Sequence, residues 1–281
     1  MKKDFFSDLT PQEREIIVDK GTEAPFSGKY NDYFEAGVFV CRACKNPLYE
    51  SNTKFNSGCG WPSFDDEIIG SINRYDDHSL GRHRIEICCA KCDGHLGHVF
   101  SGENITKKNT RHCVNSLSIQ FKPYNNLDSV FLAGGCFWTI EKTFKNITGV
   151  YMTQCGYMGG NTKNPSYEDV CSGITNHAEV IQIYFDNEII NFDSILDIFW
   201  NNHDPTSINK QGDDEGSQYR SVIFYTSLSQ KNAAERSKSR LQKSYINKKV
   251  VTQIIKSDKF YRAEEHHQDY LNKNNLDACT T

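Results

Sequence analysis

The sequence lacks the features of several protein classes. None of its apolar runs reaches the roughly 18 residues of a membrane helix, and no apolar segment follows the basic Lys2-Lys3 start as in a secretory leader. It has no basic surplus, since 32 Lys and Arg against 36 Asp and Glu leave a net charge of −4. We therefore expect a cytoplasmic protein with no membrane or nucleic-acid partner, in which thiols serve metals or chemistry.

Length and cysteine content are what the sequence has in excess. Its 281 residues exceed the needs of one small core, so we expect two domains. A hydrophobic content of 37%, a charged content of 24% and a mean hydropathy of −0.62 exclude a disordered or fibrous chain. Eleven cysteines are an odd number, so they cannot all pair as structural disulfides.

The two halves of the chain differ in pattern. After a helix capped by Thr10, residues 29–121 are rich in Gly, Ser, Asn and aromatic residues, which predicts a mainly β domain. The second half alternates strands and helices, which predicts an α+β sandwich domain. Its expected elements are strands at 129–133, 180–185 and 221–225, and helices after Cys136, at 193–200 and at 230–246.

A polar, turn-prone stretch at 122–128 is the best boundary between these halves. We predict domains at 1–124 and 129–281, joined by a short linker at 125–128.

Two Cys-x-x-Cys pairs stand in the first half, Cys41 with Cys44 and Cys89 with Cys92. Four thiolates satisfy a tetrahedral zinc ion and leave no open position, so the metal would be structural. The alternative is a thioredoxin-like redox motif in one of the pairs. That motif needs a helix N-terminus within a βαβ unit, which this β-rich stretch does not supply.

Three further motifs in the first half carry reactive residue types. They are Ser-Gly-Cys-Gly-Trp-Pro-Ser-Phe at 57–64, Gly-His-Leu-Gly-His-Val-Phe at 94–100 and Arg-His-Cys-Val-Asn-Ser at 111–116. A nucleophilic thiolate needs a nearby cation or base and a donor that orients it. Arg111, His98 and Asn115 can supply these if the fold brings them together. Taken singly, a lone cysteine is usually inert, and His95 is typical of a hydrogen-bonded core residue.

Together these motifs resemble the type B methionine sulfoxide reductases over about residues 9–124. The resemblance implies Cys113 as nucleophile, Cys59 as resolving cysteine, and the four paired cysteines as zinc ligands. It further implies Trp61 as the face for the substrate methyl group, and four residues that position water and the sulfoxide oxygen, namely His95, His98, Arg111 and Asn115. Two departures are His112, where the family usually has an aromatic residue, and the additional Cys88, which we expect to fill the core.

In the second half, Gly134-Gly135-Cys136 lies between a predicted strand and a predicted helix. A helix N-terminus directs its positive dipole end and unpaired N–H groups at the sulfur, which stabilises a thiolate. Read alone, Cys136 is also compatible with a buried cysteine that packs a turn.

The motifs around Cys136, Tyr167, Glu179, His203 and Tyr219 resemble those of the type A methionine sulfoxide reductases over about residues 129–270. The resemblance implies a pocket of Phe137 and Trp138 for the S-methyl group and Glu179 as the acid that protonates the sulfoxide oxygen. Hydrogen bonds would come from Tyr167 and Tyr219, and Asp214 would order the site. Asn176 and Cys155 depart from the family's usual residues.

The tail from Asn274 is polar and carries Cys279. A mobile terminal thiol can reach Cys136 after that residue becomes a sulfenic acid, so we predict Cys279 as the resolving cysteine. The alternatives are that Cys279 is an unpaired exposed thiol, or that Cys171 resolves Cys136, which we consider less suited because its segment is predicted to be packed.

The prediction is a bifunctional methionine sulfoxide reductase. By resemblance, the type A domain takes the S epimer and the type B domain the R epimer, in free and protein-bound methionine sulfoxide. Thioredoxin is the expected external dithiol, structural Zn²⁺ the metal, and no organic cofactor is expected. The competing hypotheses are a zinc-ribbon module that binds RNA and a thiol peroxidase or general disulfide reductase.

Overall fold

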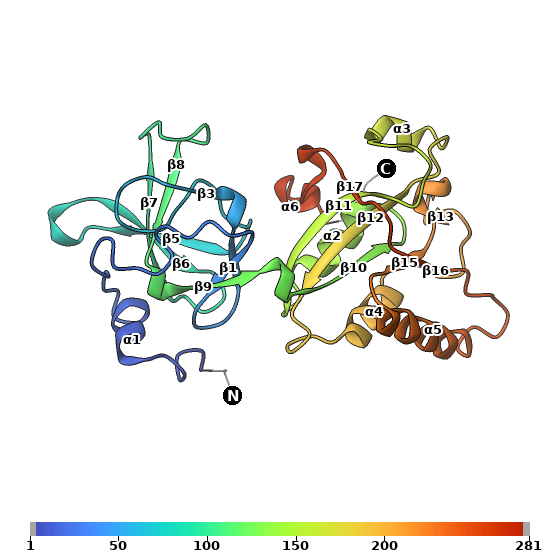
Figure 1. The fold of residues 1–281 in the computed structure, drawn as a ribbon, viewed down its shortest axis with the longest axis horizontal. Coiled ribbons are helices and arrows are strands. Elements are labelled where there is room, and N and C mark those ends of the chain that lie inside the picture. Colours follow the sequence, from blue (N-terminus) through green and yellow to red (C-terminus); the bar gives the residue numbers. More distant parts are fainter. Residues whose placement is uncertain (1–3, 278–281) are drawn as a thin grey trace. The chain divides into compact units, whose positions relative to one another are not determined.

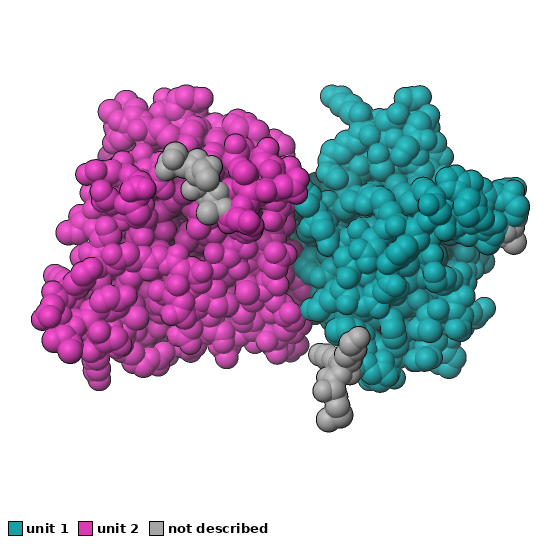
Figure 2. Space-filling model, turned by 180° about the vertical axis from the view of Figure 1, so that it is seen from behind, with its two compact units in different colours: residues 1–126 teal, residues 127–281 magenta. Residues whose placement is uncertain are grey.

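The structure, a computed structural model, describes residues 4–277, and it divides into two compact units. The units comprise residues 1–126 and 127–281 (Figures 1 and 2). The division falls within the polar stretch that the sequence marks as a boundary. Two domains, the first rich in β-sheet, are confirmed. Among residues 4–277, no helix is both long and apolar enough to cross a bilayer.

The first unit is built from one short helix and two antiparallel sheets (Figure 1). The sheets have the strand orders β2-β1-β9 and β3-β4-β8-β7-β6-β5. The elements are α1 (Pro11–Ile17), β1 (Gly37–Cys41), β2 (Pro47–Glu50), β3 (Lys54–Phe55), β4 (Ser63–Phe64), β5 (Ile72–Asp77), β6 (Arg84–Cys89), β7 (His95–Ser101), β8 (Thr110–Val114) and β9 (Ile119–Pro123).

Aromatic side chains fill the space between these sheets. Tyr49 stacks on Phe64 with ring centroids 4.2 Å apart, and Phe39 meets Phe64 edge-on at 5.0 Å. All three are fully buried. Because such rings bury large apolar areas, they hold the ends of the short strands β3 and β4 in place, next to the loops that carry the site.

The second unit is a six-stranded sheet in the order β16-β15-β10-β12-β11-β17, with helices packed on it (Figure 1). Every pair in this sheet is antiparallel except β15–β16. The elements are β10 (Asp128–Ala133), α2 (Phe137–Lys145), β11 (Val150–Met158), α3 (Tyr167–Cys171), β12 (Ala178–Phe185), α4 (Phe192–Asn201), β13 (Lys210–Gln211), β14 (Asp214–Glu215), β15 (Val222–Tyr225), α5 (Leu228–Gln242), β16 (Gln253–Lys256), β17 (Tyr261–Arg262) and α6 (Tyr270–Lys273).

Alternation along β10 divides the core of this unit into two layers. Val130 and Leu132 join a cluster with buried residues of α2, α4 and α5, whereas Phe131 and Ala133 join a separate cluster with residues of β12 and β15. The sheet is therefore covered by apolar side chains on both faces. The strand leads directly into Gly134, Gly135 and Cys136, so the core fixes the position of that thiol.

The side chain of His203 packs against the turn at Gly134 and Gly135. An added Cβ at Gly134 would press on the His203 ring, which is itself held by the Phe199 carbonyl and the Ser221 hydroxyl at 2.7 Å each. Burial lowers the pKa of His203 to about 4. The folded protein therefore holds this imidazole neutral at pH values where an unfolded chain would protonate it.

This gives a test of acid stability. The unfolded state binds a proton at His203 below pH 6.5 and the folded state only near pH 4, so stability is lost as pH falls through this window. Between pH 7 and pH 4.5, we expect the second unit to lose about 2 kcal/mol of unfolding free energy through this group. In urea unfolding of the full chain, His203→Gln should lower the stability at pH 7 but remove this part of the pH dependence. Identical pH dependence in both proteins would contradict the assignment.

Candidate functional sites

Four cysteines of the first unit converge on one point. Their sulfur atoms all lie within 4.8 Å of one another, with Cys41–Cys92 at 3.6 Å and Cys44–Cys89 at 3.5 Å. Sulfurs bound to one tetrahedral zinc ion at about 2.3 Å are separated by about 3.8 Å. The donor set and its spacing therefore fit such an ion.

The backbone turns at the two pairs are alike. Lys45 and Asp93, each directly after a pair, adopt left-handed φ angles of 61° and 60°. Their N–H groups donate to the carbonyls of Cys41 and Cys89, at 3.0 and 2.8 Å. Such turns point both thiols of a pair to the same side. The contacts between the sulfurs then join the turn after β1 to the turn after β6, although these turns are far apart in sequence.

Two further cysteines of this unit, Cys59 and Cys113, lie in contact, with their sulfurs 3.8 Å apart. Cys113 lies on β8, where it pairs with Ser63 of β4, and Cys59 lies in the loop that leads into β4. The Ser57 hydroxyl also donates to the Cys59 sulfur at 3.0 Å. A disulfide between these cysteines needs only a small movement of that loop.

A shared proton couples these two thiols. The hydrogen bond from Cys113, with those from Ser57 and Ser63, lowers the pKa of Cys59 to about 4. The hydrogen bond to Cys59 and burial raise the pKa of Cys113, which the Arg111 guanidinium opposes. Either sulfur can be the donor in this contact, so the two thiols share one proton.

Both predicted histidines lie on β7, beside Cys113. His98 is the cross-strand partner of Cys113, and its Nε2 lies 2.8 Å from Asp77 Oδ2. His95 is buried, with its Nδ1 2.7 Å from Glu86 Oε1. Each imidazole is therefore oriented by a carboxylate. Neither Asp77 nor Glu86 is among the residues predicted for the site from the sequence.

Gly97, between the two histidines, has a φ of 154°. An added Cβ there would clash with the Cys113 carbonyl oxygen, so only glycine allows this close approach of β7 and β8.

Arg111 and Asn115 lie on either side of Cys113 but are bound elsewhere. Arg111 forms a bidentate pair with Glu103 at 2.7 and 2.8 Å. Asn115 donates to the Leu96 carbonyl at 3.2 Å and accepts from the Glu23 N–H at 3.1 Å. Arg111 lies close enough to Cys113 to act on its thiol through its charge, whereas the Asn115 amide is engaged by Glu23 and Leu96.

Glu23 is a site residue that sequence reasoning missed. Its backbone carbonyl accepts from the indole Nε1 of Trp61 at 3.0 Å, and its buried carboxylate accepts from the N–H groups of Ser116 and Leu117. With its bond to Asn115, this one residue joins the Trp61 loop to the segment after Cys113. No sequence signal distinguishes it, because it is a single acid in a turn-prone stretch.

The two departures in this unit are both buried. The His112 ring contacts Tyr49 and lies 3.0 Å from a Glu67 oxygen, in place of an aromatic side chain. Cys88 is 1% exposed, and burial raises the pKa of its thiol to about 12. It is not part of the four-cysteine group, which supports the prediction that it fills the core.

In the second unit, Cys136 is the N-cap residue of α2. The next residue, Phe137, donates its backbone N–H to Glu179 Oε2 at 3.0 Å. Glu179 is 1% exposed and lies on β12. This hydrogen bond holds the carboxyl group beside the residue that would carry the reacting thiol.

Aromatic rings surround this thiol. Phe137 lies 6.0 Å from Trp138 and 6.4 Å from Tyr167, centroid to centroid. His267 packs against all three, at 5.5, 5.5 and 4.3 Å, and neither of its ring nitrogens has a hydrogen-bond partner among the described residues. His267 is thus a second residue of the site that sequence reasoning missed. In the sequence it is half of a His266-His267 pair, which without a third ligand at helical spacing is interpreted as structural or surface.

The predicted hydrogen-bond donors keep their protons. Burial, a hydrogen bond with Cys171 and the Glu179 charge raise the pKa of Tyr167. Burial, Glu179 and Asp214 likewise raise the pKa of Tyr219. The Tyr167 and Tyr219 phenols therefore both lie within the electrostatic influence of Glu179, and Asp214 also acts on Tyr219.

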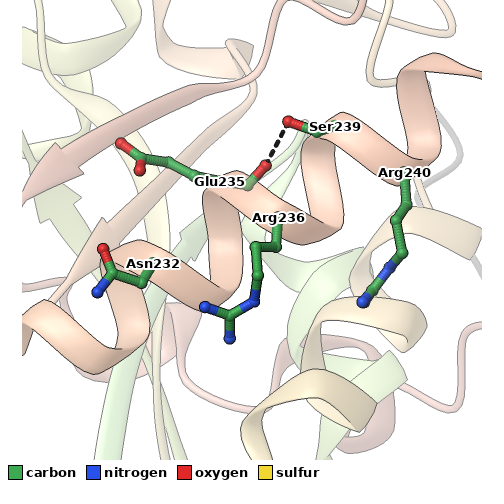
Figure 3. A pocket seen from close by; sticks show the side chains of 5 residues that line it. All are labelled: Asn232, Glu235, Arg236, Ser239 and Arg240. Carbon is green, nitrogen blue, oxygen red and sulfur yellow. Dashed lines mark hydrogen bonds between the residues drawn. The ribbon is translucent and has the colours of Figure 1, made fainter.

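The remaining cysteines of this unit differ in accessibility. Cys171, at the end of α3, is exposed, so the prediction of a packed position was wrong. Cys155 is fully buried 3.2 Å from Glu141 Oε2, where burial raises the pKa of its thiol. The predicted resolving residue Cys279 lies outside the described residues. A shallow hollow on α5 contains none of the predicted residues, and it is lined by Asn232, Glu235, Arg236, Ser239 and Arg240 (Figure 3).

Two protein-family models match the chain. The model described as SelR domain matches residues 9–123, and the model described as peptide methionine sulfoxide reductase matches residues 128–281.

Curated relatives and solved structures match the second half. The peptide methionine sulfoxide reductase MsrA of Methanothermobacter thermautotrophicus is 50% identical over 146 residues, which are 52% of this chain and 86% of that protein. Peptide methionine sulfoxide reductase A1 of Arabidopsis thaliana is 49% identical over 139 residues, or 50% of this chain and 68% of that protein. The reduced form of Mxr1 from Saccharomyces cerevisiae aligns with a TM-score of 0.53 and 34% identity, covering 55% of this chain and 90% of that one.

The proton shared by Cys59 and Cys113 predicts a pattern of alkylation. At pH 6, Cys59 should react with iodoacetamide faster than the exposed Cys171, whose pKa is raised by burial. Cys113→Ala removes the thiol donor to Cys59, so it should slow the reaction at Cys59 but leave Cys171 unchanged. Peptide mapping by mass spectrometry gives both rates. Equal labelling of Cys59 in the two proteins would contradict the coupling.

Proposed function

We propose a division of labour within this chain, which belongs to the peptide methionine sulfoxide reductase family and carries a SelR domain before its reductase domain. The chain is an enzyme that reduces methionine sulfoxide, with reductase domains of both the A and the B type. The proposal is that the second unit reduces the S epimer at Cys136 and the first unit the R epimer at Cys113. The observation that carries it is the presence of two separate thiol sites, each with its own set of polar side chains that can bind the sulfoxide oxygen.

At Cys136, the thiolate attacks the sulfoxide sulfur while the oxygen is protonated. Glu179 supplies the proton, and Tyr167 and Tyr219, which retain theirs, donate hydrogen bonds to the oxygen. Phe137 and Trp138 receive the methyl group, and Asp214 orders the phenols. The S–O bond of the sulfoxide breaks and the oxygen passes to the Cys136 sulfur, so methionine leaves reduced and Cys136 is oxidised to a sulfenic acid.

At Cys113, the same reaction takes place with different side chains. His98 and His95, oriented by Asp77 and Glu86, position water and the oxygen, together with Arg111 and Asn115. Trp61, anchored by Glu23, is the face for the methyl group.

The assignment of Cys113 as nucleophile requires the thiolate on Cys113. The two sulfurs are in contact, and transfer of the shared proton to Cys59 leaves the thiolate on Cys113 beside Arg111.

Each sulfenic acid then condenses with a second thiol, which forms a disulfide and releases water. Cys59 resolves Cys113. An external dithiol, for which thioredoxin is our proposal, is oxidised as it returns each disulfide to two thiols. Zn²⁺ bound by Cys41, Cys44, Cys89 and Cys92 stabilises the first unit and takes no part in the redox steps. The substrates are free and protein-bound methionine sulfoxide, and the proposed compartment is the cytoplasm.

The described end of the chain supports Cys279 as the resolving cysteine for Cys136. Lys142 of α2 donates to the Leu276 carbonyl at 2.6 Å and pairs with Asp277 at 3.2 Å. Lys142 follows Cys136 by six residues, about 9 Å along the helix axis. The two residues from Asp277 to Cys279 span at most about 7 Å, so with the side chains added the sulfurs can meet.

The division of labour predicts epimer-specific losses. With dithiothreitol as reductant, Cys113→Ser should lose reduction of the R epimer about a thousandfold or more and keep that of the S epimer, and Cys136→Ser should do the reverse. Cys171→Ser is the matched control and should keep both. Full rates for both epimers in both single variants would overturn the two-site model. Equal turnover of a peroxide would favour a general thiol peroxidase.

The resolving role has its own test. After one turnover of the S epimer by Cys113→Ser protein, peptide mapping should find a Cys136–Cys279 disulfide. Cys279→Ser should stop at the sulfenic acid, which dimedone labels, whereas Cys171→Ser should form the disulfide normally. Because Cys171 is exposed and interacts with Tyr167, a Cys136–Cys171 link is the outcome that would reassign the role.

A further inference from the structure

The hairpin between β5 and β6 gathers three metal-binding side chains that the reductase chemistry does not use. Asp76 lies near the end of β5, and His78 and His83 lie in the loop that connects it to β6. One ligand atom from each lies within 4.8 Å of the other two. His83 Nε2 is 2.8 Å from Asp76 Oδ1, and the two imidazole rings stack with centroids 4.9 Å apart.

We propose that Asp76, His78 and His83 form a surface site for one divalent transition-metal ion, and that this ion weakens the neighbouring Asp77–His98 pair. Two imidazoles and one carboxylate are ligands that suit Zn²⁺, Ni²⁺ and Co²⁺, and three protein ligands leave positions for water. All three side chains are exposed, with Asp76 at 69% and His83 at 59%, so an ion reaches them from solvent.

A second cluster, Glu86 with Cys88 and His95, is a weaker candidate. It is buried, and both oxygens of its carboxylate are already engaged, by Lys20 at 2.8 Å and by His95 at 2.7 Å. A cation there would displace these partners, whereas the hairpin site loses only one exposed His83–Asp76 contact.

The hairpin site is one residue from the site around Cys113. Asp77 follows Asp76, and its Oδ2 lies 2.8 Å from His98 Nε2 and 2.7 Å from the Arg84 guanidinium. The Ser79 N–H donates to the other oxygen at 2.8 Å. Because consecutive strand residues point to opposite faces of the sheet, the ion acts on Asp77 through its charge and not by contact. It attracts the Asp77 carboxylate and repels the Arg84 guanidinium, which weakens the hydrogen bond to His98. The metal site stands on its own geometry, whereas this coupling rests on the proposed function.

Binding is tested with Ni²⁺ on the reduced full-length protein. Isothermal titration should give one Ni²⁺ fewer per chain in His83→Asn and in His78→Asn than in the wild type. His266→Asn, which removes an exposed histidine of the other unit, is the matched control and should keep the wild-type stoichiometry. Bound Ni²⁺ should also raise the melting temperature of the wild type by mass action. Unchanged stoichiometry in both hairpin variants would overturn the site.

The coupling is tested in the same chain with the two epimers. Without Ni²⁺, His83→Asn should reduce both epimers at wild-type rates. Ni²⁺ that saturates the hairpin should lower R-epimer turnover by the wild type about fivefold, the lower end of typical coupling, and leave S-epimer turnover unchanged. His83→Asn should be insensitive.

An equal fall in turnover of both epimers, or the same fall in His83→Asn, would indicate that Ni²⁺ binds the catalytic thiols and would overturn the coupling. A wild type that never reduces the R epimer would instead reject the proposed function, while the stoichiometry result stands.

Discussion

The distance of 3.8 Å between the Cys59 and Cys113 sulfurs is the constraint on which the first unit depends. A disulfide bond is about 2.05 Å long, so the two thiols are in contact without being bonded, and a small movement joins them. Holding a loop thiol at this distance from a strand thiol requires the β4–β8 pairing and the anchor at Glu23. The four-cysteine group adds rigidity by tying the β1 and β6 turns together.

The second unit meets the same chemical need differently. Its proposed nucleophile, Cys136, is placed by a helix N-terminus, and Glu179 binds the first N–H of that helix. The same helix, α2, holds the C-terminal segment through Trp138 stacked on Tyr270 at 3.9 Å and through Lys142. One helix thus positions both Cys136 and the described end of the chain.

Local patterns predicted the elements but not the long-range partners. The capping box at Thr10 and the strand-to-helix turn at Cys136 are local, so the sequence was sufficient for both. The helix predicted to reach residue 246 ends at Gln242, and β11 was missed although it is the longest strand of its sheet. β11 reads Val-Tyr-Met-Thr-Gln-Cys-Gly-Tyr-Met, which does not alternate cleanly because both of its edges are paired and most of it is buried.

The site residues divide in the same way. Residues in contiguous motifs could be recognised, but Glu23, Asp77 and Glu86 act through partners 9 to 94 positions away, and each is an ordinary acid in the sequence. The exposure of Cys171 likewise depends on how α3 packs. Discrimination between epimers also depends on groups that are far apart in sequence. A site tells the two hands of a chiral sulfur apart by where it places three groups: the attacking thiolate, the donor to the oxygen and the pocket for the methyl group. Two unrelated sheets can present those directions with opposite hand, whereas one site that holds all three cannot serve both epimers. Under the proposed division of labour, this accounts for two folds in one chain.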